Sequence, residues 1–262
     1  MKIFNTPPQF PKGLQCFLGA IFLLPLFARS QSFSDSTQRN NVIKVDLTSN
    51  FWYMKAYNFT YERKVKANQT FSVTAGSQQL KGIGSRIQSD EIETGNATAK
   101  GYKIAADYRF YLRKENRFQA PHGVYIGPYF AYHHFKNNWD ITIDGDSGPQ
   151  TGSTEGKFDI LNVGLQAGYQ FLLGNRWAID LSFIGASASN YRAQMNIKGD
   201  FDLSDTDISQ ELLDALMARF PLLEDLMEDQ SIDQSGKLNN WGMGIRYQIH
   251  VGYAFGGGKK KK

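Results

Sequence analysis

The sequence predicts an all-β protein, an eight-stranded antiparallel transmembrane β-barrel, on three observations. Apolar and polar residues alternate with a period of two in many segments, which is typical of strands with two different faces. The connections between these segments alternate between long and short along the chain. The composition combines 14% aromatic residues with 25 glycines. A membrane barrel uses both, because aromatic side chains lie at the lipid interfaces while small residues fill a crowded lumen.

The first thirty residues have the pattern of a signal peptide. Lys2 and Lys12 precede an apolar run at 16–27, which is short for a membrane-spanning helix. We expect cleavage before Gln31; an uncleaved anchor is the alternative. The only cysteine, Cys16, lies in this segment, so the mature chain has neither a disulfide framework nor a cysteine-based metal site.

The remaining chain divides into a flexible lead at 31–40, a barrel at 41–256 and a lysine-rich periplasmic tail at 257–262. The formal net charge is only +4. Three of the basic residues lie in the signal segment, so the mature chain carries no general nucleic-acid footprint and we expect no nucleic-acid partner.

The clearest strand lies at 241–255. Every second residue from Trp241 to Phe255 is apolar or aromatic, and the residues between them are small or polar with several glycines. A Gly-rich polar face suits a narrow barrel interior. The same alternation predicts further strands at 42–48, 57–62, 70–76, 102–112, 160–172 and 177–183. The eighth, at 123–135, has an unclear phase, and we expect a bulge at Pro128, since proline cannot donate to a sheet ladder.

The connections sort by their position in the chain. Tight or moderate turns are expected at 66–68, 114–116 and 174–175, whereas 80–99, 136–156 and 187–237 are long; the first connection, 50–55, is short. Outer-membrane barrels have long loops outside and short periplasmic turns, which predicts periplasmic termini. The tryptophans near the predicted strand ends suit an interfacial belt: Trp52, Trp139, Trp177 and Trp241.

The last long connection contains an acidic segment, 200–233. A helical pattern between Ile208 and Phe220 ends at Pro221, so we expect a helical insertion in the last extracellular loop. Its acids could bind cations, bridge lipopolysaccharide through a divalent metal or dock a partner: Asp202, Asp205, Asp207, Glu211 and Asp214. They lack the Gly and distal Glu of a calcium loop, and a solvated, self-packed helix is the simpler alternative.

Eight charged residues fall on the predicted inward faces: Lys44, Asp46, Glu62, Lys103, Asp107, Arg109, Asp180 and Arg246. An unpaired buried charge costs several kcal/mol, so opposite charges should pair. Eight strands leave an interior that side chains just fill, which favours a structural polar network. A gated pore or proton path is the alternative.

The four histidines are His122, His133, His134 and His250. The pair at 133–134 suggests a metal site or a hydrolase base, but adjacent strand residues point to opposite faces. No Ser or Cys nucleophile stands at a recognisable spacing. We therefore expect no enzyme activity, no catalytic residue, no cofactor and no metal.

Several strand motifs resemble a known family: NVIKVDL at 41–47, YERKV at 61–65, GYKIAADYRFYL at 101–112, GVYIGPYF at 123–130 and GIRYQIHVGYAF at 244–255. The chain from about 41 to 256 is similar to the small outer-membrane barrels of Bacteroidetes-type bacteria grouped as domain-of-unknown-function family 3575. The resemblance implies a signal peptide, a single β-barrel and an outer-membrane location. The family has no established activity, so it implies no functional residue.

We therefore expect a structural or partner-binding barrel in the outer membrane of a Gram-negative cell, with a filled polar lumen and extracellular loops as the interaction surface. A narrow ion-conducting pore and a surface lipid-modifying enzyme are alternatives, and a soluble periplasmic β-sandwich is the architectural rival. The expected partners are outer-membrane lipids, including lipopolysaccharide, and a protein docking at 200–233.

Overall fold

The computed structural model describes residues 39–80, 92–116, 118–145, 148–174, 176–198 and 237–257. The predicted signal peptide, most of the lead, the acidic segment 200–233 and the lysines of the tail lie outside these ranges. The predicted helical insertion therefore lies outside the described residues as well.

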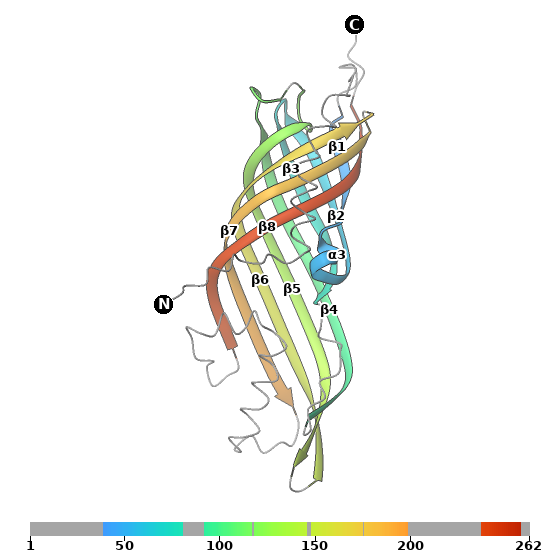
Figure 1. Cartoon of the computed structure of the whole chain (residues 1–262), viewed down its shortest axis with the longest axis vertical. Coiled ribbons are helices and arrows are strands. Elements are labelled where there is room, and N and C mark those ends of the chain that lie inside the picture. Colours follow the sequence, from blue (N-terminus) through green and yellow to red (C-terminus); the bar gives the residue numbers. More distant parts are fainter. Residues whose placement is uncertain are drawn as a thin grey trace, which may run out of the picture. The chain divides into compact units, whose positions relative to one another are not determined.

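Eight antiparallel strands form a closed barrel in which each strand pairs with the next and β8 pairs with β1 (Figure 1). This confirms the predicted all-β, eight-stranded antiparallel barrel. The strands are β1 (Asn41–Asp46), β2 (Tyr53–Lys66), β3 (Gln69–Leu80), β4 (Ile92–Tyr111), β5 (Gly123–Gly145), β6 (Gly148–Leu173), β7 (Trp177–Lys198) and β8 (Lys237–Phe255). In the described ranges, no helix is long and apolar enough to cross a membrane.

Burial alternates along the strands as predicted. In β1, Lys44 and Asp46 are buried while Ile43 and Val45 are exposed, and the pattern continues in β2 and β3. The phase of β5 is now defined, because Tyr125 and Tyr129 are buried whereas Ile126 is exposed. Polar and small residues and several tyrosines thus face the interior, and most large apolar residues cover the outside.

The expected bulge at Pro128 is wrong. Pairing of β5 with β6 runs unbroken through this residue, and the register with β4 is the same before and after it. The ladder with β4 instead omits the pairs at Pro128 and Gly127. A Cβ on Gly127 would overlap the Tyr108 carbonyl oxygen, so glycine allows the two strands to approach closely here. The missing N–H donor of Pro128 therefore removes local pairing between β4 and β5 without shifting their register.

All three expected long loops are partly strand; in the last, 187–237, β7 continues to Lys198. β5 and β6 remain paired up to Gly145 and Gly148, so 136–156 is mainly a hairpin, and β4 already begins at Ile92. The prediction failed because the apolar alternation ends before the backbone pairing does. Outward positions such as Lys136 and Asn138 are polar, although the strand continues through them.

The first connection holds a short helix that was not predicted, α3 (Ser49–Trp52). Asp46 fixes its start, because its carboxylate accepts hydrogen bonds from the backbone N–H groups of Thr48 and Ser49 at 3.0 and 3.2 Å. Asp46 therefore serves both the barrel interior and the turn that leaves β1.

The tryptophan prediction is wrong at one position. Trp139 lies within β5 on its inward phase and is only partly exposed, with its ring near the position that a Cβ on Gly156 would take. Trp52, Trp177 and Trp241 are each at least 60% exposed. Three of the four are thus placed for an outer belt.

Candidate functional site

The structure brings the eight charged residues predicted for the lumen into one buried network. They come from β1, β2, β4, β7 and β8, and each is at most 9% exposed. Four are acids and four are bases, so their formal charges sum to zero: Lys44, Asp46, Glu62, Lys103, Asp107, Arg109, Asp180 and Arg246. A neutral sum is what a low-dielectric interior requires.

Lys44 and Arg109 hold the acids at one end of this network. The Lys44 ammonium lies 2.7 Å from Glu62 and 2.6 Å from Asp180. The Arg109 guanidinium lies 2.7 Å from the same Asp180 oxygen. Both bases also donate to the Gln170 amide oxygen, at 3.1 and 3.3 Å. Each base thus contacts acids from other strands and ties β1, β2, β4 and β7 together.

Asp107 links these residues to the rest of the network. It lies 2.5 Å from Arg109 and 3.7 Å from Arg246. Arg246 in turn donates to Gln248 at 2.7 Å, and Gln248 donates to Asp46 at 3.3 Å. Lys103 lies 3.0 Å from Asp46. The eight charges are therefore connected through contacts between neighbours.

Neutral side chains that the sequence did not single out complete the network. Thr70 and Tyr111 donate to Glu62 at 2.6 and 3.0 Å, and Tyr125 donates to Asp180 at 2.8 Å. Arg109 also lies over the Tyr125 ring, 4.4 Å from its centroid. Inward strand phase was the available signal for Thr70 and Tyr111, whereas Tyr125 lies on the strand whose phase was unclear.

The connection between β4 and β5 folds back over one end of the barrel. Ala120 is buried against Tyr111 and Tyr125, and its N–H donates to the Ala67 carbonyl at 3.1 Å. His122 contacts the Phe118 ring, and burial lowers the pKa of His122 to about 4, so it is neutral at physiological pH. This end of the lumen is thereby covered by the buried residues that end the connection: Ala120, Pro121 and His122.

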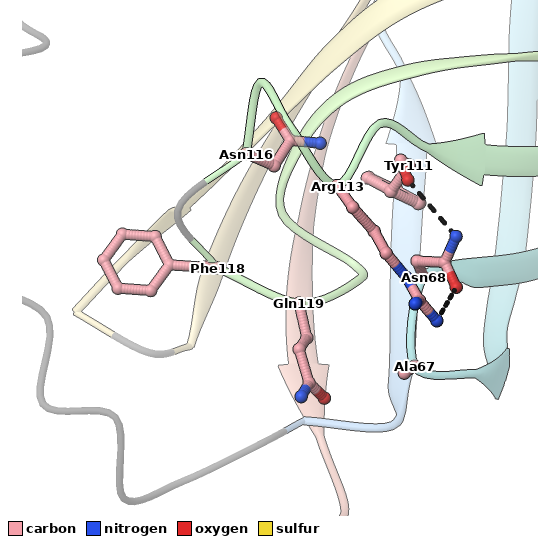
Figure 2. Close-up of a pocket in the computed structure, with 7 residues that line it drawn as sticks. All are labelled: Ala67, Asn68, Tyr111, Arg113, Asn116, Phe118 and Gln119. Atoms are coloured by element: carbon pink, nitrogen blue, oxygen red, sulfur yellow. Dashed lines mark hydrogen bonds between the residues drawn. The ribbon is translucent and has the colours of Figure 1, made fainter.

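A pocket of about 380 Å³ lies outside this cover (Figure 2). Its lining residues are Ala67, Asn68, Tyr111, Arg113, Asn116, Phe118 and Gln119. Arg113 is the one charged residue among them, and it donates to Asn68 at 3.1 Å. Phe118 points away from the other side chains in Figure 2. The pocket therefore presents little that would select a ligand.

The histidine pair of β5 is split between the two faces. His133 points inward, with its Nδ1 2.8 Å from the Gln78 amide nitrogen, whereas His134 lies outside, 2.6 Å from Asp159. The two rings therefore do not face a common ligand. Among the residues that the structure describes, no group of three His, Cys, Asp or Glu side chains could hold a metal ion. The acidic candidates Asp202, Asp205, Asp207, Glu211 and Asp214 lie outside the described residues.

Comparison with known proteins gives a family and several distant structural likenesses, two of which follow. The model of the family described as "Protein of unknown function (DUF3575)" matches residues 21–198. CarO of Acinetobacter baumannii is 9% identical with a TM-score of 0.41, and the match covers 83% of this chain and 98% of CarO. A major outer membrane protein from Thermus thermophilus is 10% identical with a TM-score of 0.33, at the same coverage of both chains. No curated protein sequence matches the chain.

Proposed function

The chain belongs to the DUF3575 family, and we propose that it is an outer-membrane β-barrel with a filled, non-conducting lumen and a structural or partner-binding role. The filled lumen carries this proposal. Its eight charged side chains are buried and arranged so that every acid faces a base within 4 Å. Such an interior joins strands together and leaves little room for an ion path.

The outer surface supports placement in a lipid layer. All eight strands carry large outward apolar side chains, which we call the apolar band. One representative from each strand, between 41% and 91% exposed, is Ile43, Phe59, Val73, Ile104, Phe130, Leu165, Ile184 and Ile245. Soluble monomers rarely expose a continuous apolar surface of this extent. Lipid acyl chains would cover this apolar surface without the free-energy penalty of exposing it to water.

The height of the apolar band suits an outer membrane. On β6 its outward residues run from Leu161 to Leu173, which is 13 positions and therefore tall enough to cross the hydrocarbon. A tilted membrane strand needs about 9–11 residues to cross the hydrocarbon. The outward positions that follow on the same strand, Asp159 and Lys157, are polar. The band therefore ends where water or lipid headgroups would begin.

The strand ends give an orientation for the proposal. The β2–β3, β4–β5 and β6–β7 turns lie at the end where β1 begins and β8 ends, and barrels of this class place short turns in the periplasm. The paired ends of β5 and β6, the end of β7 at Lys198 and the start of β8 at Lys237 lie at the opposite end, since β5 and β7 run away from the short turns. The β5–β6 hairpin and the connection between β7 and β8 are the proposed extracellular interaction surface.

Conductance in a planar lipid bilayer tests the filled lumen. The purified mature chain should insert as a barrel whose gel mobility changes on heating, and should leave the current at the lipid baseline. As a positive control, Arg109→Ala/Tyr125→Ala removes two large interior side chains and should increase leakage. Steady, ohmic current steps from the unaltered chain would contradict the proposal in favour of the pore.

The partner-binding role needs a second experiment. The unaltered chain and a chain lacking 200–233 are each used to capture proteins from cell envelopes. Loss of specific partners on deletion supports docking at that segment, whereas retained partners place docking elsewhere.

A further inference from the structure

Three lysines from three neighbouring strands stand side by side on the outside of the barrel. Lys100 of β4 is paired with Lys136 of β5, and Lys136 is paired with Lys157 of β6. All three occupy outward positions and none is buried. We call Lys100, Lys136 and Lys157 the lysine row. Because like charges directly opposite each other destabilise a sheet, the row needs compensating negative charge.

Glu155 supplies part of that charge. Its carboxylate lies 2.6 Å from Lys136 and 2.9 Å from Lys157. Hydrogen bonds from these two ammonium groups lower the pKa of Glu155 to about 2. The formal charges of Glu155 and the three lysines sum to +2, and Asp159, the next outward acid on β6, contacts His134 at 2.6 Å. The row therefore attracts further anions even with Glu155 in place.

The row lies immediately above the apolar band. Tyr102 and His134 stand two positions below Lys100 and Lys136 on the same strands, about 7 Å closer to the band. Their rings are 5.1 Å apart, and Tyr132 donates to Asp159 at 2.7 Å beside them. Tyrosines at this height are typical of the interface between hydrocarbon and headgroups. The lysines thus stand at the level of the headgroups.

We propose that the lysine row binds the phosphate groups of a phosphorylated glycolipid in the outer leaflet. The acyl chains of that lipid lie along the apolar band below, and its phosphates contact the row above. The row supplies charge complementarity, and its continuity with the band distinguishes a lipid from a free anion. This inference rests on the proposed outer-membrane function and names a lipid partner for it.

Native mass spectrometry of the full mature chain in detergent tests the site with bisphosphorylated lipid A as the probe. Each lysine near a membrane surface contributes about fivefold in affinity. The variant Lys100→Gln/Lys136→Gln/Lys157→Gln should therefore bind about a hundredfold more weakly. The control Lys64→Gln/Lys66→Gln/Lys114→Gln removes the same charge at the opposite end of the barrel and should stay within about twofold of the unaltered chain.

A second variant keeps the test decisive if the triple variant does not fold. Glu155→Gln removes the competing carboxylate and retains all three lysines, so it should tighten lipid A binding about fivefold. An unchanged affinity in this variant would count against the proposal.

Other ligands show whether the bound phosphate belongs to lipid A, to another anionic lipid or to a free anion. Dephosphorylated lipid A, phosphatidylglycerol and inorganic phosphate should each bind at least tenfold more weakly than lipid A. If phosphatidylglycerol binds as tightly as lipid A, the row is a general anionic-lipid site instead. If inorganic phosphate binds as tightly as lipid A, the row is a site for free anions instead. If the lysine changes leave lipid A binding unaffected, the proposed lipid site is wrong. Flotation with vesicles and heat-modifiable gel mobility test the proposed membrane function separately.

Discussion

Removing the Lys44 ammonium should destabilise the barrel more than any change at its turns. Lys44→Met keeps the length of the side chain and removes its charge. The ammonium lies 2.6 Å from Asp180, 2.7 Å from Glu62 and 3.1 Å from Gln170, and all of these groups are fully buried. The network of four bases and four acids becomes one of three bases and four acids. One buried negative charge is then uncompensated.

The expected loss in the free energy of unfolding follows from the contacts that Asp180 and Glu62 keep in this variant. Breaking a buried ion pair by removing one partner costs about 3–5 kcal/mol. Asp180 keeps Arg109 at 2.7 Å, and Glu62 keeps its hydrogen bonds from Thr70 and Tyr111. Because these contacts remain, we expect a loss in the free energy of unfolding near the lower end of that range, about 3 kcal/mol.

A compensated variant separates charge from packing. Lys44→Met/Glu62→Gln restores a neutral sum, and the glutamine oxygen can still accept from Thr70 and Tyr111. It should cost less than Lys44→Met alone, with a coupling energy of about 1–3 kcal/mol. Lys66→Met, at an exposed turn, should stay within about 0.5 kcal/mol of the unaltered chain.

Urea unfolding in phospholipid vesicles, followed by tryptophan fluorescence, measures the unaltered chain and four variants: Lys44→Met, Glu62→Gln, Lys44→Met/Glu62→Gln and Lys66→Met. Lys44 does not stabilise the barrel through its charge if Lys44→Met costs no more than Lys66→Met, or if the compensated variant costs the sum of its two single changes.

Three further outcomes are expected. Gly127→Ala should lose about 1–3 kcal/mol of unfolding free energy in the same urea assay, since its Cβ would overlap the Tyr108 carbonyl oxygen. Gly242→Ala should be tolerated, because its Cβ would lie 3.5 Å from the Tyr191 ring. Equal costs for the two variants would contradict this prediction. The Glu155 carboxylate, followed by ¹³C NMR, should titrate near pH 2. Its ion pairs therefore stabilise the hairpin fully above about pH 4.5, and this stabilisation is lost as the pH falls through about 2. A titration midpoint near pH 4.5 would count against these ion pairs. In variants with a single tryptophan, brominated lipids should quench Trp177 and Trp241 but not Trp139, and strong quenching of Trp139 would place it outside the barrel.

The separation of inside from outside was predictable because strand period and side-chain direction are directly linked. A residue such as Lys44, between two apolar neighbours, can face only the side that they do not. Once a barrel is inferred, the same parity places Asp46 and Arg109 in the lumen. The sequence thus predicts the members of the charged network.

Strand length was less predictable, since the apolar pattern reports the lipid-facing height and not the extent of backbone pairing. β5 continues to Gly145 although Lys136 and Asn138 already interrupt the outward apolar face. Trp139 was misplaced for the same reason, because it lies within the extended strand instead of at its end.

Contacts between strands were beyond the sequence, because they depend on register. Lys100, Lys136 and Lys157 are far apart along the chain and meet only through the pairing of β4, β5 and β6. Tyr125 reaches Asp180 in the same way, across 55 residues. Such sites become visible only after the barrel is closed.

Placing an arginine within the apolar band tests most directly whether lipid covers the barrel. Leu165 is 67% exposed near the middle of the band on β6, and Ser153 is an exposed outward residue above the band on the same strand. In vesicles, Leu165→Arg should lower the free energy of unfolding by about 2–4 kcal/mol, while Ser153→Arg should change it by less than about 0.5 kcal/mol. If Leu165→Arg is as harmless as Ser153→Arg, the band faces water and the membrane placement is wrong.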